Sequence, residues 1–564
     1  MKILLAQFNP LIGDLSGNTK ILCQACVKAN KANANLILTP ELSLWGYPPK
    51  DLLLDKSLIK LQEKSLQGIQ ETLINKTNNV SILVGIAERT EDNFSPNLYN
   101  SIVHINQNGW KVVARKQLLP TYDVFDEKRY FRTGNSSNIL LFKETGKIIK
   151  IGLTICEDIW VDELIQGEKL SGPDPIKKLI PEKLDILINL SASPFSKTKK
   201  KYRELLAKQA VRRLGCPVLY LNQVGANDEL IFDGSSFILN EKAETICKLK
   251  SYQEEFEIWN IANNKKIPTQ KKTSPQEEIF RALVFGLKDY AKKCGFSSTI
   301  IGLSGGIDSA LVAIIAAAAL GKERITSVLM PSPWSSSGSL IDAIALTQRI
   351  NSRGIQLPIG NLMNEFGNTL SSYLGNEPKG ITAENLQSRI RGTLLMAVAN
   401  HEGHLLLCTG NKSELAVGYC TLYGDMNGGL AVIGDLYKTE VFSLCEWIDS
   451  DDSQACRKAL GLPEQGELIG REIRNKPPSA ELKPGQLDSD SLPNYPLLDS
   501  ILKGLIEEKK QPNELINEGI DKEIVMKVVK LLRKGEFKRH QAPPLLKVSD
   551  QAFGSGRRLP IAAK

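Results

Sequence analysis

Three residues in the first half of the chain, Glu41, Lys116 and Cys156, carry side chains that could together hydrolyse an amide. A cysteine thiolate attacks the amide carbon, a carboxylate takes and returns the proton, and a lysine ammonium stabilises the tetrahedral oxyanion. Each residue follows an apolar or β-branched run typical of a strand. We expect Cys156 to lie at a strand-to-helix turn, where the pKa of a thiol is lowered.

The sequences around these residues are more specific than the residue types. In chain order they are Pro-Glu-Leu at 40–42, Arg-Lys-x-x-Leu-Pro at 115–120 and Cys-Glu-Asp-Ile-Trp at 156–160. Their order and spacing resemble the nitrilase-superfamily amidases, which have a Glu–Lys–Cys triad on an αββα sandwich. The resemblance implies a general base at Glu41, an oxyanion-stabilising cation at Lys116 and a nucleophile at Cys156.

Neighbouring segments indicate the amide that is hydrolysed. The runs 121–127, 189–194 and 225–230 resemble the glutaminase branch that is attached to NAD+ synthetases. The resemblance implies glutamine contacts at Tyr122, Glu157, Ser193 and Lys199. Some relatives carry arginine where Lys199 aligns. A lysine there can contact the substrate α-carboxylate as a point charge, without the bidentate fork of arginine.

The second half contains the run Gly-Leu-Ser-Gly-Gly-Ile-Asp-Ser at 302–309, which follows an apolar run and precedes an apolar helical segment. Small residues let the backbone wrap around an anion, while its N–H groups and the helix N-terminus supply positive potential. Ser304 and Ser309 can donate to phosphate oxygens, and Asp308 can hold Mg2+. The Gly-Lys-Ser/Thr ending of a Walker A loop is missing, and so is the Gly-x-Gly-x-x-Gly dinucleotide fingerprint.

This run resembles the loop of enzymes that split ATP into AMP and pyrophosphate while they adenylate an acid, a carbonyl or a base. The segments 384–391, 409–416, 423–426, 434–439, 477–482 and 537–544 resemble the NAD+ synthetase domain in particular. The implied ATP contacts are Gly302, Leu303, Ser304, Gly305, Gly306, Ile307, Asp308, Ser309 and Thr409. The implied deamido-NAD+ contacts are Asn385, Arg389, Glu414, Lys438 and Lys538, and the implied Mg2+ ligands are Asp308 and Glu414.

At least two domains must position these groups, because a chain of 564 residues is too long for one hydrophobic core. We expect a nitrilase-like αββα glutamine amidohydrolase domain at 1–262, a polar, lysine-rich linker at 263–275 and an ATP-dependent domain at 276–564. The strand, glycine turn and long helix after the linker favour a doubly wound parallel α/β sheet, Rossmann-like and similar to the adenine nucleotide hydrolases.

Composition excludes several protein classes. With 42% hydrophobic and 24% charged residues, the chain is typical of ordinary soluble globular proteins rather than disordered or fibrous ones. Its net charge of +8 suits anionic nucleotides but is too dispersed to indicate nucleic acid, and Lys197 to Arg203 is interpreted as a solvated helix face. No apolar stretch is long enough for a membrane span, and the cysteine pattern favours reduced thiols in the cytoplasm. The pairs Cys23/Cys26 and His401/His404 are interpreted as structural. Homo-oligomerisation is expected, because edges of such sandwiches often pair.

The leading hypothesis is a ligase that hydrolyses glutamine through a Cys156 thioester. It would pass the ammonia through an internal channel and convert deamido-NAD+ to NAD+ with ATP. One alternative is amidation of another nucleotide-like carboxylate. A second is modification of RNA, which the lack of paired cysteine motifs and of a strongly basic appendage disfavours. A third, in which the first half is a non-catalytic scaffold, conflicts with the intact Glu41, Lys116 and Cys156.

Overall fold

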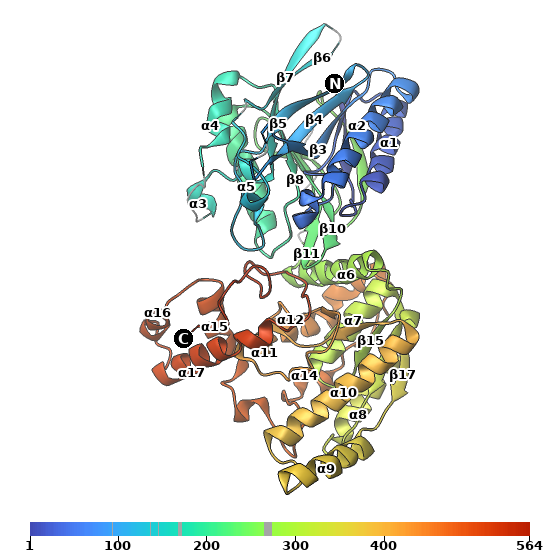
Figure 1. Cartoon of the computed structure of the whole chain (residues 1–564), viewed down its shortest axis with the longest axis vertical. Coiled ribbons are helices and arrows are strands. Elements are labelled where there is room, and N and C mark those ends of the chain that lie inside the picture. The colour runs from blue at the N-terminus through green and yellow to red at the C-terminus, as the bar shows by residue number, and fades with distance from the viewer. Residues whose placement is uncertain (93, 136, 145, 167–171, 264–272, 564) are drawn as a thin grey trace. The chain divides into compact units, whose positions relative to one another are not determined.

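The computed structural model describes all residues except 93, 136, 145, 167–171, 264–272 and 564 (Figure 1). The chain divides into two units, Met1–Lys272 and Thr273–Lys564. Most of the expected linker at 263–275 lies outside the described residues.

The first unit is built on two six-stranded sheets. In the first sheet the strand order is β14-β1-β2-β3-β4-β5, with β1 (Lys2–Gln7), β2 (Leu36–Leu38), β3 (Ser81–Arg89), β4 (Leu98–Asn106), β5 (Gly109–Arg115) and β14 (Glu255–Asn260). In the second it is β13-β12-β9-β8-β7-β6, with β6 (Ile139–Glu144), β7 (Lys147–Ile155), β8 (Ile186–Ser191), β9 (Val218–Asn222), β12 (Phe237–Leu239) and β13 (Thr245–Lys248). The strands β10 (Val224–Asn227) and β11 (Leu230–Asp233) form a separate hairpin.

The alternation of side chains along each strand explains why these sheets stack and are also covered by helices. In β1, Ile3 and Leu5 belong to the core between the two sheets, whereas Leu4 and Ala6 belong to the core beneath the helices. Helices α1 (Leu15–Lys31) and α2 (Lys56–Lys76) contribute to that outer core, and α4 (Pro175–Leu179) and α5 (Lys199–Leu214) cover the second sheet. The result is the predicted αββα sandwich.

The second unit contains one parallel five-stranded sheet. Its order is β17-β16-β15-β18-β19, with β15 (Thr299–Gly302), β16 (Ile325–Leu329), β17 (Arg353–Gln356), β18 (Leu405–Cys408) and β19 (Leu430–Ala431). The chain builds outward from β15 to β17 on one side and then from β18 to β19 on the other. The strand order therefore reverses between β15 and β18, and ligands bind at such a point, beyond the carboxyl ends of the strands.

Helices connect these strands, and their sequences show which of them are buried. Helix α7 (Ile307–Leu320) is apolar on all sides, and eleven of its fourteen residues are buried. Helix α6 (Pro275–Lys293) begins where the Ser274 side chain accepts a hydrogen bond from the Glu277 N–H, with proline in its first turn. The other helices around the sheet are α8 (Ser337–Ile350), α9 (Gly360–Leu374), α10 (Ile381–Glu402), α11 (Lys412–Val417) and α12 (Lys438–Ile448).

Within the second unit, the last part of the chain packs against the β18 and α11 region through α15 (Tyr495–Ile506) and α17 (Lys522–Lys534). One fully buried ammonium, that of Lys412, links it to the sheet. Its Nζ lies 3.0 Å from Asp435 Oδ1 and 2.8 Å from Glu507 Oε1, and it also donates to Ser549 Oγ at 2.8 Å. The Asp435 carboxylate in turn accepts from the Val548 and Ser549 N–H groups. Residues 548 and 549 are thus fixed beside the start of α11.

Both units confirm the predicted α/β class, with a nitrilase-like sandwich and a parallel, doubly wound sheet. None of the helices among the described residues has the length and apolar character of a membrane span.

Candidate active sites

In the first unit, each of the three predicted catalytic residues lies just after a strand. Glu41 follows β2, Lys116 directly follows β5, and Cys156 directly follows β7. The Lys116 Nζ lies 2.7 Å from Glu41 Oε1, and both side chains are almost completely buried. Glu41 and Lys116 both act electrostatically on the Cys156 thiol. The structure therefore brings the predicted triad together.

The Glu41 carboxylate is held on both oxygens. Oε1 accepts from Lys116 and from Asn100 Nδ2 at 2.8 Å, and Oε2 accepts from the Ala192 N–H at 3.0 Å. Its backbone is supported by Gly85. A Cβ at that position would lie 2.3 Å from the Leu42 nitrogen and 2.8 Å from the Pro40 carbonyl oxygen. Only glycine lets β3 approach the Glu41 loop so closely.

Cys156 has a backbone φ of +43°, in the left-handed region that non-glycine residues seldom adopt. The carboxylate of Asp158 holds this turn. It accepts from the Ile155 N–H at 3.1 Å, and across to the lysine loop from the Gln117 N–H at 2.9 Å and the Leu118 N–H at 2.8 Å. The nucleophile and the Lys116 loop are therefore joined through one buried carboxylate.

The predicted lowering of the Cys156 pKa is wrong. Burial, reinforced by the Glu41 carboxylate, raises the pKa of the thiol well above its ordinary value, and Lys116 opposes this shift. The resting cysteine is consequently a protonated thiol. It needs a base to become a nucleophile, and Glu41 is the carboxylate with the largest electrostatic effect on the thiol.

A fourth ionisable residue, Glu127, was not singled out from the sequence. Its Oε1 lies 2.7 Å from the Lys116 Nζ and accepts from the Tyr47 hydroxyl at 2.8 Å. Burial raises the pKa of Glu127 to about 7, against the opposing effect of Lys116. Glu127 belongs to the 121–127 run, but no local pattern distinguishes it from an ordinary surface carboxylate.

The predicted glutamine contacts form a second group beside the triad. The Tyr122 hydroxyl donates to the Glu157 carboxylate, at 2.9 Å from Oε1 and 3.1 Å from Oε2. The Lys199 ammonium lies over two buried aromatic rings, 4.9 Å from the centroid of Phe125 and 5.7 Å from that of Trp160. These rings fix a flexible lysine through cation–π attraction.

Ser193 is buried, and the Arg203 side chain holds it. Arg203 Nε donates to the Ser193 Oγ at 3.1 Å, while its Nη1 lies 2.7 Å from Asp233 Oδ1. Arg203 is itself only 2% exposed, so the interpretation of 197–203 as a solvated helix face is wrong at this residue. The guanidinium is turned inward because a buried carboxylate pairs with it.

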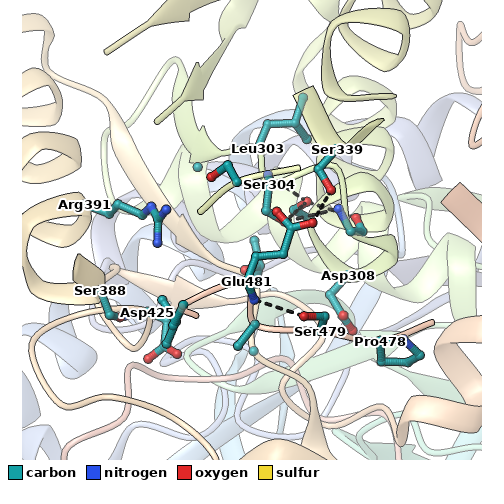
Figure 2. Close-up of a pocket in the computed structure, with 18 of the residues that line it drawn as sticks. Leu303, Ser304, Asp308, Ser339, Ser388, Arg391, Asp425, Pro478, Ser479 and Glu481 are labelled. Atoms are coloured by element: carbon teal, nitrogen blue, oxygen red, sulfur yellow. Dashed lines mark hydrogen bonds between the residues drawn. The ribbon is translucent and has the colours of Figure 1, made fainter. Parts of the chain in front are cut away.

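In the second unit, a cavity of about 650 Å3 lies at the carboxyl ends of β15, β16 and β18 (Figure 2). Among the predicted ATP contacts, those that line it are Gly302, Leu303, Ser304, Gly306, Ile307, Asp308, Ser309 and Thr409. Gly305 has a φ of +79°, and a Cβ there would lie 2.2 Å from the Ser339 carbonyl oxygen. Glycine is therefore required for the loop to pass the start of α8.

A charged cluster closes one side of this cavity. The Lys438 ammonium pairs with the Asp308 carboxylate and lies 3.5 Å from Glu414 Oε1. Asn411, which caps α11, also donates from Nδ2 to Asp308 Oδ1 at 3.0 Å. Burial and the nearby Asp308 raise the pKa of Glu414 to about 8, which Lys438 opposes. The loops after β15 and β18 therefore meet at the switch point.

Three predicted deamido-NAD+ contacts lie outside the lining of this cavity. Asn385 accepts from the Thr421 hydroxyl, Arg389 is exposed and donates to the Leu422 carbonyl, and Lys538 donates to the Gly418 and Cys420 carbonyls. Other side chains that line the cavity were not singled out from the sequence: Lys476, Glu481, Ser339 and Arg391. Glu481 accepts hydrogen bonds from Ser336 and Ser339 at the N-terminus of α8.

The two cysteine and histidine pairs have structural surroundings. Cys26 is buried in the core beneath α1, and the partly buried Cys23 packs against the same core. The His404 ring lies between Ser298, 2.7 Å from Nδ1, and Glu402, 2.8 Å from Nε2.

The folds and sites define a carbon–nitrogen hydrolase unit joined to a nucleotide-dependent ligase unit. Residues 2–264 match the carbon-nitrogen hydrolase family model, and residues 279–542 match the NAD synthase family model. The chain is 47% identical to the glutamine-dependent NAD+ synthetase of Synechocystis sp., over 99% of this chain and 98% of the relative. It is 40% identical to that of Acinetobacter baylyi, with the same coverage.

A solved structure agrees with these matches. The glutamine-dependent NAD+ synthetase of Acinetobacter baumannii, in complex with ADP, is 37% identical, with a TM-score of 0.75 over 99% of this chain and 98% of that chain. The chain belongs to the glutamine-dependent NAD+ synthetase family.

Proposed function

We propose that this chain forms NAD+ from deamido-NAD+, taking the amide nitrogen from glutamine and splitting ATP into AMP and pyrophosphate. The observation that carries the proposal is the presence, in one chain, of a complete buried Glu–Lys–Cys triad and of a loop with Ser304, Asp308 and Ser309 lining a nucleotide-sized cavity. Family membership supports the same pair of half-reactions.

In the first half-reaction, Cys156 Sγ attacks the side-chain amide carbon of glutamine. Glu41 takes the thiol proton and delivers it to the leaving ammonia, and the Lys116 ammonium stabilises the oxyanion. Water, activated by the same carboxylate, then hydrolyses the thioester to glutamate. Glu157, Tyr122, Ser193 and Lys199 hold the amino acid end of the substrate.

In the second half-reaction, the nicotinate carboxylate of deamido-NAD+ attacks the α-phosphorus of ATP, and pyrophosphate leaves. The loop of 304–309 and Lys438 stabilise the departing charge. Ammonia then attacks the acyl carbon of the adenylate and AMP leaves. Asn385, Arg389 and Lys538 are the proposed dinucleotide contacts, and they would place the reacting carboxylate from outside the lining of the nucleotide cavity.

We propose Mg2+ as the metal of the second site. The donors fit this ion, because Asp308 and Glu414 present oxygen ligands beside a phosphate-binding loop, and Mg2+ is usually held by one or two carboxylates together with substrate phosphates. When bound, the ion would neutralise charge on the leaving pyrophosphate. Lys438 holds both carboxylates in place before nucleotide enters.

We assign the glutaminase to residues 1–262 and the synthetase to 276–564, and we propose that ammonia passes internally between the two active sites. A cytoplasmic location suits the ten cysteines, all of which are free thiols. Homo-oligomerisation is supported by α9, which has no buried residue. Its Leu362, Phe366 and Tyr373 are exposed at spacings of four and seven that place them on one helix face. A Phe366→Glu variant should lower the mass measured by light scattering.

The defining experiment supplies deamido-NAD+, ATP, Mg2+ and glutamine, and measures NAD+, AMP and glutamate together. The three products should appear in step. A Cys156→Ala variant should make NAD+ only when ammonium is added. Glutamate without NAD+ would show that the amidase is correct and the acceptor is wrong. Equal entry of labelled external ammonia and glutamine nitrogen would contradict the internal passage.

A further inference from the structure

Helix α10 carries two arginines that face different surroundings. Arg389 and Arg391 are two positions apart, which separates them by about 200° around an α-helix. Arg389 is exposed, whereas Arg391 lines the nucleotide cavity together with Gly302, Met330 and Leu395. Arg391 is therefore the α10 arginine that a bound nucleotide can reach.

The Arg391 guanidinium uses one of its five N–H donors within the protein. Its Nε donates to the Met330 carbonyl oxygen at 3.1 Å, and this bond fixes the plane of the group. Among the described residues, none accepts a hydrogen bond from the other four N–H groups, and the side chain extends into the cavity in Figure 2. Burial lowers the pKa of Arg391, and only the carboxylate of Glu481 opposes that shift.

A guanidinium in such surroundings favours an anionic ligand. Removing a cation from water costs free energy unless an opposite charge and hydrogen bonds compensate it. Neutral adenine offers acceptors without charge, whereas a phosphoryl group offers charged oxygens that match the fork of an arginine. Arg391 is therefore a cationic position of the cavity in addition to Lys438, Lys476 and Lys483. Lys476 differs from it, because the Lys476 ammonium is paired with the Asp342 carboxylate.

The position of Arg391 indicates which phosphoryl group it would contact. The loop of 304–309 and Lys438 account for the pyrophosphate end. Arg391 instead contacts Met330, directly after the neighbouring strand β16, and in the view of Figure 2 Glu481 is drawn between Arg391 and Asp308. We propose that Arg391 binds a phosphoryl oxygen of the adenylyl group, a role that rests on the proposed function of this cavity. It would hold this group from ATP through the acyl adenylate to AMP.

The test measures, by titration calorimetry, the equilibrium binding of AMP and of adenosine to the full-length protein. Arg391→Met should weaken AMP binding about tenfold or more, because a charge-assisted bidentate contact is lost. Adenosine binding should change by less than about twofold, because adenosine has no phosphate. The AMP affinity of Arg391→Lys should lie between those of Arg391→Met and the unaltered protein, because lysine restores the charge without the fork of arginine.

The control is Arg324→Met, which removes an exposed arginine from the residue before β16, at the opposite end of that strand. It should bind AMP as the unaltered protein does, and glutamine hydrolysis should be unchanged in all variants. An equal loss of AMP and adenosine binding in Arg391→Met would overturn the phosphate assignment, and so would unchanged AMP binding. If the unaltered protein binds neither AMP nor adenosine, the proposed function itself fails.

Discussion

Glu41 and Glu127 share one ammonium, that of Lys116, with each carboxylate Oε1 2.7 Å from its Nζ. All three side chains are buried, so the position of the lysine depends on both carboxylates. In the proposed mechanism, Glu41 also exchanges protons with Cys156 during the reaction. Glu127 can then hold the ammonium while the charge on Glu41 changes.

A pH dependence follows from Glu127. Because its pKa is about 7, the carboxylate becomes protonated below that pH and loses charge as the partner of Lys116. We expect kcat/KM for glutamine to fall as the pH is lowered through about 7. Glu127→Gln should be slower by about two orders of magnitude and should lack this acid limb. Identical pH profiles in the two proteins would contradict the assignment.

The raised pKa of Glu127 also makes the stability of the folded protein depend on pH. The pKa of Glu127 in the folded protein lies above the ordinary glutamate value of 4.5, so the fold favours the protonated form. The stabilising contribution of Glu127 is therefore present below pH 4.5 and lost as the pH rises through about 7. As the pH rises over this interval, the melting temperature of the unaltered protein should fall relative to that of Glu127→Gln. Scanning calorimetry at several pH values measures the difference.

Gly85 offers a test of how the Glu41 loop is supported. In Gly85→Ala the new Cβ would overlap the backbone of residues 40–42, so this loop must move. Glutamine hydrolysis should fall by about tenfold or more, because displacements of about 1 Å at a reacting group are costly. NAD+ formation from ammonium should persist. Gly68→Ala is the matched control, because a Cβ at residue 68 of α2 meets nothing within 4 Å.

The aromatic rings beneath Lys199 should influence substrate affinity more than turnover. Phe125→Leu removes the closer ring, and we expect KM for glutamine to rise about threefold to tenfold with little change in kcat. Phe142→Leu, which removes a buried ring from β6, serves as the control. The result would count against the proposed role if kcat fell instead, or if the control raised KM equally.

The buried Lys412 should dominate the stability of the second unit. Lys412→Met leaves the Asp435 and Glu507 carboxylates without their cation, and removing one partner of a buried pair costs about 3–5 kcal/mol. Lys458→Met, at a 70% exposed lysine paired with Glu464, should cost less than about 1 kcal/mol. Urea unfolding of both variants checks this, and similar losses would contradict the prediction.

Parts of both sites could be predicted because their information is local. The Glu41, Lys116 and Cys156 segments and the loop of 302–309 each combine an unusual run of residues with a strand exit. The strand, glycine turn and helix pattern likewise predicted the parallel sheet of the second unit, whereas the αββα sandwich was implied by the resemblance to the nitrilase-superfamily amidases. Local sequence carries no information on which charges become buried together, and so Glu127 and Arg391 were missed.

The errors have the same origin. A lowered pKa at Cys156 was expected from its turn, but complete burial beside Glu41 outweighs the turn. Arg203 was interpreted as part of a solvated lysine-rich face, but Asp233, 30 residues further along, draws it inward. Both outcomes depend on contacts between residues that are distant in the chain.

The link between Lys412 and Ser549 also has a consequence for protein synthesis. The ammonium directly after Asn411 acquires its full set of partners only when residues 548–551 are in place. A ribosome that stopped some twenty residues early would release a chain whose triad residues are all present but whose Lys412 lacks these partners. In such a chain we expect the two half-reactions to separate, with glutamine hydrolysis retained and NAD+ formation lost.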